Sequence, residues 1–196
     1  MIVESFTIDW YAARAAGLVA YLLVSSSVAL GLLLAGKARL ERWPRFALED
    51  VHRFAGMLAG TFIGLHVLMI GIDSQAHLGV GELIVPFASH YRPFWTGMGI
   101  VAAELLVALA VTNHYRKRLP HAIWRRFHYL NLAVWLAATG HGLGAGTDSG
   151  AGWFLALYTV TTVTIVLLAI RRFSGSRQPA RPPKQSESVG LEPGTN

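Results

Sequence analysis

Cysteine is absent from this sequence of 196 residues, and only 14% of the residues are charged. The lack of cysteine excludes disulfide bonds, covalent attachment of a c-type heme and iron–sulfur clusters held by thiolates. No glycine-rich dinucleotide-binding fingerprint follows a strand-like segment. The first fourteen residues, MIVESFTIDWYAAR, lack the basic start and the cleavage site of a signal peptide. We therefore expect neither a cleaved leader nor a nucleotide-binding domain in this chain.

Apolar residues dominate instead, at 53% of the chain. Several apolar runs approach the ~20 residues that a helix needs to cross a bilayer. They cover residues 15–35, 53–72, 94–112, 126–143 and 153–170. We expect an all-α integral membrane protein in which residues 1–172 form a bundle of about five transmembrane helices. The polar segment 173–196 is rich in Pro, Gly and Ser and should be a disordered cytoplasmic tail.

Basic residues in the connecting loops predict the orientation of this bundle. They concentrate in the connections 36–53 and 113–126, whereas 73–93 holds a single arginine and 144–152 none. We therefore expect the N-terminus outside and the C-terminus in the cytoplasm of a cell, with the bacterial inner membrane as the expected location. The net charge of +6 then reflects membrane orientation, reinforced by anionic lipid. It requires the lipid bilayer as a partner and no nucleic acid.

Four of the eight histidines form two matching pairs in the second and fourth predicted spans. His52 and His66 are fourteen residues apart, and His128 and His141 are thirteen apart. At 1.5 Å per residue, each separation is roughly 20 Å, which is most of the hydrocarbon thickness. Because the two spans run in the same direction, His52 should be level with His128 near the cytoplasm, and His66 with His141 near the outside. This arrangement suits two b-type hemes, each with two axial histidines.

Helical geometry satisfies this pairing only in part. Fourteen residues rotate an ideal helix to within about 40° of four full turns, so His66 lies on nearly the same face as His52. Thirteen residues fall roughly 140° short of four turns, which would place His128 and His141 on different faces. We therefore expect a helix distortion at Thr139–Gly140. The alternative is that all four are interior histidines bonded to backbone or polar neighbours. A catalytic zinc site is disfavoured because the histidines of one helix are too far apart to share an ion.

The histidine spacing, together with the segments 86–102 and 124–148, resembles the ferric reductase-like transmembrane domain family. The family includes the membrane parts of NADPH oxidases and ferric reductases, and the heme membrane subunit of bacterial methionine sulfoxide reductase systems. The resemblance covers residues 15–170. It implies electron transfer from a cytoplasmic reductant through an inner heme to an outer heme. The acceptor would then be ferric iron, oxygen or a partner reductase.

The chain departs from the larger oxidases in two respects. A short tail stands where they carry a flavin and nicotinamide domain, and five expected spans replace their six. The donor would be a separate flavoprotein reductase, a loosely bound flavin or a quinol. Two other functions stay open: a non-catalytic heme subunit linking the quinone pool to a soluble reductase, and a heme-sensing or structural membrane protein. The chain is an oxidoreductase if it is an enzyme at all.

Other polar residues admit a functional and a plain interpretation. Arg53, Arg125 and Arg126 lie beside the expected inner ligands and could pair with heme propionates, or could simply mark the cytoplasmic side. Glu104, in the middle of the third predicted span, could orient a ligand histidine or handle protons. Alternatively, it could face the bundle and pair with the Ser25–Ser27 run.

The remaining histidines and several tryptophans have weaker signals. His77 and His90 in the outer loop could bind a metal or a partner, but solvated loop histidines are the simpler interpretation, as they are for two further histidines of the inner loop. Tryptophans near the membrane surface suit an aromatic belt better than an electron relay. The residues concerned are His114, His121, Trp95, Trp135 and Trp153.

Overall fold

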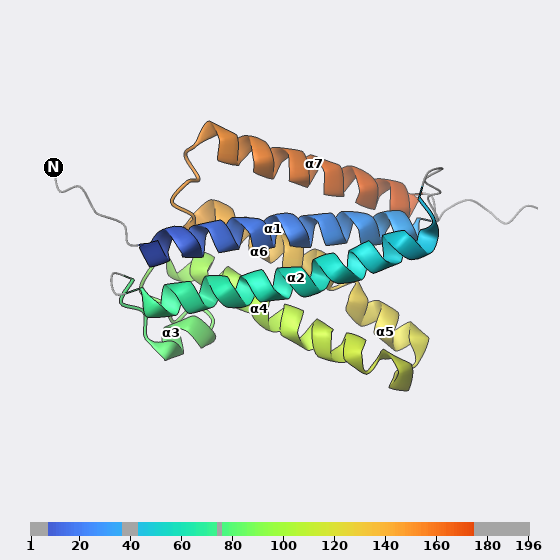
Figure 1. Ribbon diagram of the computed structural model, residues 1–196, viewed down its shortest axis with the longest axis horizontal. Coiled ribbons are helices and arrows are strands. Elements are labelled where there is room, and N and C mark those ends of the chain that lie inside the picture. Colours follow the sequence, from blue (N-terminus) through green and yellow to red (C-terminus); the bar gives the residue numbers. More distant parts are fainter. Residues whose placement is uncertain (1–7, 37–42, 74–75, 175–196) are drawn as a thin grey trace, which may run out of the picture.

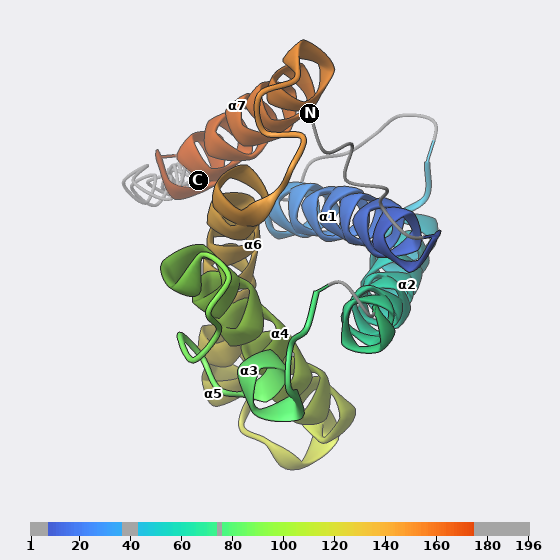
Figure 2. The same cartoon turned by 90° about the vertical axis from the view of Figure 1, so that its left-hand side faces the viewer.

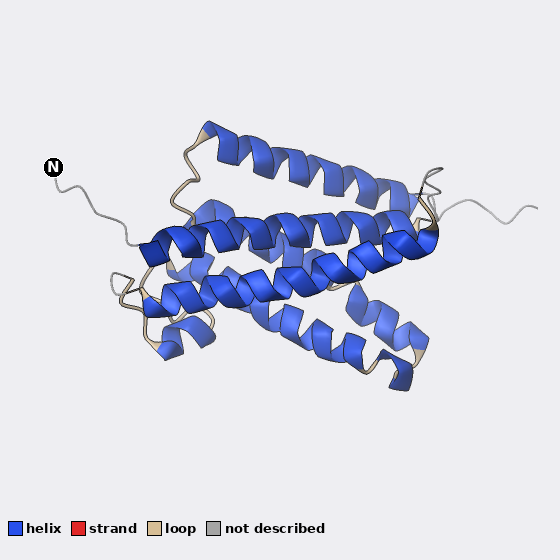
Figure 3. Cartoon of the chain, viewed as in Figure 1, coloured by secondary structure: helices blue, strands red, loops and turns tan. Residues whose placement is uncertain are grey.

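The computed structural model describes residues 8–36, 43–73 and 76–174, and every regular element in these ranges is a helix (Figures 1 and 3). The long helices run side by side as a bundle. In chain order the elements are α1 (Ile8–Ala35), α2 (Arg45–Ile72), α3 (Val80–Ile84), α4 (Pro93–His114), η1 (Arg116–Arg118), α5 (His121–His128), α6 (Asn131–Ala145) and α7 (Gly152–Ser174). The all-α membrane bundle expected from the sequence is confirmed.

The four longest helices, α1, α2, α4 and α7, are each long and apolar enough to cross a membrane. With 22 to 28 residues, they span about 33–42 Å, more than the ~30 Å of hydrocarbon. Each contains one of the predicted spans and is longer than it. The helix α7 continues to Ser174, so residues 173 and 174 are helical. The rest of the predicted tail, residues 175–196, lies outside the described residues.

The prediction of one continuous helix over residues 126–143 is wrong. A turn at Tyr129–Leu130 separates α5 from α6, which has only 15 residues. In an unbroken helix the N–H of Leu132 would bond to the carbonyl of His128. It bonds instead to Tyr129 O at 3.1 Å, and the side chain of Asn131 donates to His128 O at 2.8 Å. A side chain that competes for a helix carbonyl in this way favours a break.

The distortion expected at Thr139–Gly140 is also absent, because α6 is helical throughout that stretch. The hydroxyl of Thr139 donates to Trp135 O at 2.8 Å within the helix. The bend that reorients the chain between His128 and His141 is instead the turn at Tyr129–Leu130. Hydrogen bonds of the tighter 3₁₀ type, such as that from Leu130 N to Phe127 O, rotate the chain by more per residue than an α-helix does. This extra rotation helps to bring His128 and His141 onto the same face.

Two helix pairs make up the bundle (Figure 2). The helix α2 packs along α1, and α4 packs along α6, while α1 also contacts α6 and α7. Buried alanines at the α1–α2 contact let the two backbones approach closely, as is usual in membranes. Across to α7, the rings of Tyr21 and Tyr158 stack with centroids 4.1 Å apart, and Tyr21 Oη lies 2.8 Å from Thr161 Oγ1. These contacts fix α1 at the centre of the fold.

Candidate functional site: two facing histidine pairs

Histidines of α2 face histidines of the α5–α6 segment at two levels of the bundle. The ring centroids of His52 and His128 lie 6.0 Å apart with planes at 74°, and those of His66 and His141 lie 6.1 Å apart at 79°. All four side chains are half-buried. The structure therefore brings together the same pairs that the sequence predicted.

Three of these rings are oriented by main-chain carbonyls. The Nδ1 atoms of His52, His66 and His141 lie 2.8, 2.7 and 2.9 Å from carbonyl oxygens. Because a carbonyl oxygen can only accept, each Nδ1 carries the proton and donates. The lone pair is then on Nε2, which is the nitrogen left to bind a metal. The accepting oxygens belong to Ser27, Ala13 and Trp95, in that order.

Each accepting carbonyl is followed four residues later by a glycine against the same ring. We call this combination a carbonyl–glycine notch, and the three notches are Ser27/Gly31, Ala13/Gly17 and Trp95/Gly99. A Cβ on Gly31, Gly17 or Gly99 would lie 3.3, 2.8 or 2.5 Å from the nearest ring atom of His52, His66 or His141. The missing Cβ lets the ring reach the carbonyl one helical turn earlier.

The sequence interpretation missed these glycines, although one signal was available. Gly17 and Gly31 are fourteen residues apart on α1, the same spacing as His52 and His66 on the antiparallel helix α2. Equal spacing on two neighbouring helices is what two equivalent contacts require. The third glycine, Gly99, has no such partner in the sequence pattern.

The fourth histidine, His128, is held differently. It is the last residue of α5, and its ring stacks on Trp124 with centroids 5.1 Å apart. Within the described residues, no main-chain carbonyl accepts a hydrogen bond from its Nδ1. The nearest polar atom is Nδ2 of Asn131, at 3.4 Å.

The separation of the ring centroids in both pairs suits two imidazoles that share one metal ion. Metal–imidazole bonds of about 2.0–2.1 Å place the two ring centres roughly 6 Å apart. Among the described residues, no group of three or more His, Cys, Asp or Glu side chains could hold an ion alone. A metal at either pair would need further ligands from outside these side chains, and a heme would supply four nitrogens. The residues present fit this group.

A cavity opens beside the His52–His128 pair. It contains about 680 Å³ of empty space, part of it open to the surroundings. Its lining combines His52 and His128 with apolar side chains and with Gly31 and Gly56, and Leu106 reaches it from α4. Apolar walls with a few oriented polar groups are typical of cofactor sites.

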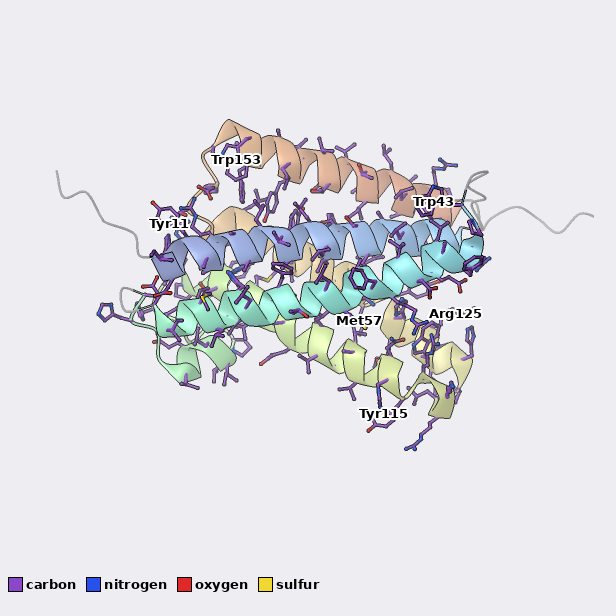
Figure 4. The ribbon with its side chains drawn as sticks, in the orientation of Figure 1. Tyr11, Trp43, Met57, Tyr115, Arg125 and Trp153 are labelled. Carbon is purple, nitrogen blue, oxygen red and sulfur yellow. The ribbon has the colours of Figure 1, made fainter. Side chains whose placement is uncertain are left out.

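The three arginines predicted to contact propionates lie at the same end as the inner pair. Arg53 is paired with Asp50 at 3.6 Å. Arg125 and Arg126 are exposed on α5 and form no ion pair within the part of the chain that the structure describes. Figure 4 shows Arg125 and Trp43 at one end of the bundle and Tyr11 at the other. The propionate role stays a prediction.

Glu104 lies on an exposed face of α4. It forms no hydrogen bond or ion pair with any described residue, so the alternative in which it pairs with the Ser25–Ser27 run is wrong. The hydroxyl of Ser25 accepts a hydrogen bond from Nε1 of Trp135 instead, at 3.1 Å. Glu104 orients none of the four paired histidines, because main-chain carbonyls accept from three of them and the side chain of Asn131 lies against Nδ1 of His128.

Polar contacts hold residues 79–92, which lie between α2 and α4. The carboxylate of Glu82 accepts hydrogen bonds from the N–H groups of Gly79 and His90, both at 3.0 Å, and lies 2.7 Å from Nδ1 of His90. These bonds, Gly79 first, lower the pKa of Glu82 to about 2. Further along, Arg92 donates to the carbonyl of Gly144 at 2.6 Å, which caps the end of α6.

The sequence matches the profile of the ferric reductase like transmembrane component family over residues 16–139. The match spans more than half of the chain and includes His52, His66 and His128. The chain therefore belongs to the ferric reductase-like transmembrane family, as the resemblance predicted. It is a multi-pass membrane protein of the electron-transfer type. No curated protein and no solved structure matches it.

Proposed function

We propose that this chain is a diheme b-type cytochrome that carries electrons across a cell membrane. His52 and His128 would hold the inner heme, and His66 and His141 the outer heme. The observation that carries the proposal is the equal separation of the two ring pairs, 6.0 and 6.1 Å, at two levels of one bundle. The electron-transfer character of the family supports it.

The residues of the chain would divide the work between binding and orientation. A bound heme supplies a reversible one-electron couple between ferric and ferrous iron. The imidazoles would bind through Nε2, while the carbonyls of Ser27, Ala13 and Trp95 hold three of the rings in place. A hydrogen bond at Nδ1 raises the basicity of the ligand, which stabilises the ferric state.

We propose that the N-terminus lies outside and that electrons enter at the end carrying η1 and α5. There Arg116, Lys117, Arg118, Arg125 and Arg126 form no ion pair within the described residues, so an acidic flavoprotein would meet an uncompensated positive surface. By contrast, basic residues at the start of α2 are partly neutralised by neighbouring acids. The outer acceptor would be ferric iron, oxygen or a partner reductase.

Heme stoichiometry tests the central claim. The purified full-length protein should contain about two hemes per chain by pyridine hemochrome assay, with the spectrum of low-spin bis-histidine heme. His66→Ala should remove one heme and largely spare the other, and His52→Ala should do the converse. His114→Ala, which changes an exposed histidine at the end of α4, is the matched control and should keep both. A wild-type protein with no heme would refute the proposal.

The identity of the donor can be tested with salt. Reduction by a flavoprotein docked on charges should slow as salt rises, because exposed charges are screened beyond about 10 Å at 0.1 M. Replacing Arg116, Lys117 and Arg118 together with glutamine should slow it further while the heme spectra stay unchanged. Arg45→Gln is the control at the same end, since Arg45 is already paired with Glu49. Reduction by a quinol should show neither effect, which would exclude the charged docking surface.

A further inference from the structure

The inner and outer histidine pairs differ in how their rings are held. Both histidines of the outer pair, His66 and His141, sit in carbonyl–glycine notches. In the inner pair only His52 does so. His128 has the side chain of Asn131 as its nearest polar neighbour at Nδ1. Both rings of the outer pair are thus pre-oriented for a metal, whereas in the inner pair only the ring of His52 is.

The position at which a fourth notch would be expected lies on α4. The two notches of α1 repeat after fourteen residues, and the notch at Trp95/Gly99 would repeat at Leu109/Asn113. The carbonyl of Leu109 instead accepts from the hydroxyl of Thr112 at 2.9 Å. Asn113 also carries a side chain where the other notches have none. The helix α4 therefore offers a notch to the outer pair alone.

The amide of Asn131 has consequences for the proton of His128. Its Nδ2 donates to His128 O at 2.8 Å and lies 3.4 Å from His128 Nδ1. An amide nitrogen has hydrogens and no available lone pair, so it can only donate to Nδ1. A neutral imidazole that accepts at Nδ1 carries its proton on Nε2. Nε2 is the atom that must be free to bind iron.

We propose that Asn131 holds His128 in the tautomer that opposes iron binding, so that the inner pair binds heme less tightly than the outer pair. The inference rests on the proposed function, because it concerns the same heme sites. Binding of heme at the inner pair then requires the proton to move to Nδ1 and the amide to turn away. Asn131 acts through His128 and is a positioning residue.

Two substitutions separate the tautomer from the helix turn. Asn131→Asp and Asn131→Leu both remove the hydrogen bond to His128 O, so they share any effect on the turn. Only aspartate supplies an acceptor for Nδ1–H, which leaves Nε2 free for iron. Partners of this kind change metal affinity by roughly 10–100-fold. Thr61→Ala is the matched control, because it likewise removes a side-chain hydrogen bond to a helix carbonyl, that of Met57, which no histidine uses.

The measurement is the rate at which each heme transfers from the purified full chain to excess apomyoglobin, with midpoint potentials recorded in parallel. The inner heme is the one that His66→Ala retains. We expect wild-type protein to lose the inner heme first, and Asn131→Asp to slow that loss by about tenfold or more and to lower the inner potential. The inner heme of Asn131→Leu should be lost at a rate between those of wild-type protein and Asn131→Asp. The outer heme of the Asn131 variants, and both hemes of Thr61→Ala, should be lost at the wild-type rate.

Each outcome decides the inference. A wild-type protein that retains only the outer heme, and regains the second in Asn131→Asp, supports it. Equal loss rates in Asn131→Asp and Asn131→Leu, or equal changes at both hemes, overturn it while leaving the diheme proposal intact. Loss of the outer heme before the inner one in wild-type protein also overturns it. A wild-type chain without heme removes the proposed function and this inference together.

Discussion

Alanine at position 99 would place a methyl group against the ring of His141. The added Cβ would lie 2.5 Å from Nδ1 and 2.8 Å from both Cε1 and Cγ. Ordinary contacts begin at 3.4 Å, so the ring or the backbone must retreat by about 0.9 Å. The hydrogen bond from His141 Nδ1 to Trp95 O is now 2.9 Å long. A shift of the ring by that amount away from the carbonyl would break it.

The cost follows from the role of that bond. Losing one hydrogen bond costs about 0.5–1.5 kcal/mol, and losing the partner that orients a ligand weakens a metal site by roughly 10–100-fold. Such a change equals about 1.4–2.7 kcal/mol. Gly99→Ala should therefore weaken the outer heme by at least tenfold and leave the inner heme in place, since His52 and His128 lie at the other level.

A graded series makes the reasoning quantitative. The Cβ distances to the facing ring predict that outer heme loss is most severe in Gly99→Ala and somewhat milder in Gly17→Ala, at 2.8 Å. Gly31→Ala, at 3.3 Å, should affect the inner heme slightly. Gly64→Ala on α2 is the control, because its Cβ would meet no described atom within 4 Å. There, helix propensity predicts a gain of up to about 1 kcal/mol in stability.

The assay is heme content by pyridine hemochrome after gel filtration, with thermal unfolding measured on the same samples. If Gly99→Ala retained both hemes with unchanged spectra, the notch would have no role in holding the ligand. If Gly64→Ala lost heme as readily as Gly99→Ala, general helix disturbance would explain the series and the steric argument would fail.

Three further substitutions test other contacts. Arg14→Met breaks the half-buried ion pair with Asp148 that ties α1 to the α6–α7 loop, and should lower stability by about 1 kcal/mol, measured by thermal unfolding at low and high salt. Glu104→Leu should leave both heme spectra unchanged and raise the unfolding temperature, since it removes an unpaired carboxyl from the centre of α4; a lost heme would contradict this. Hydrogen bonds, led by the one from Gly79, lower the pKa of Glu82 to about 2. The stability that ionised Glu82 gives the loop is therefore full above about pH 4.5 and is lost as the pH falls towards 2. Proteolysis of the loop in wild-type protein should therefore become faster over this pH range, and Glu82→Gln should abolish this pH dependence.

Hydropathy located the spanning helices, but not where α1 and α2 begin. The helix α2 starts at Arg45, eight residues before the predicted span, because the segment between is charged rather than apolar. Ion pairs at helical spacing, Arg45 with Glu49 and Asp50 with Arg53, support this first part of the helix. As a result His52 lies two turns inside α2 and not at its end.

The pairing of histidines was predictable because it depends on level, which spacing along two parallel helices sets. The orientation of each ring was not. It depends on which carbonyl a neighbouring helix presents, and this requires the rotation of α1 and α4 about their own axes. The break at Tyr129–Leu130 was equally hidden, because a single asparagine side chain takes the carbonyl that would have continued the helix.

The unequal spacing of the histidines explains why that break exists. On α2 fourteen residues keep His52 and His66 on one face of a regular helix, so the helix needs no distortion. On the facing segment thirteen residues do not, yet both ring pairs end up about 6 Å apart. The turn before Asn131 absorbs the difference, and it leaves His128 at a helix end, where a side chain is its nearest polar partner. The same asparagine therefore allows the inner pair to form and limits how well His128 is prepared for its ligand.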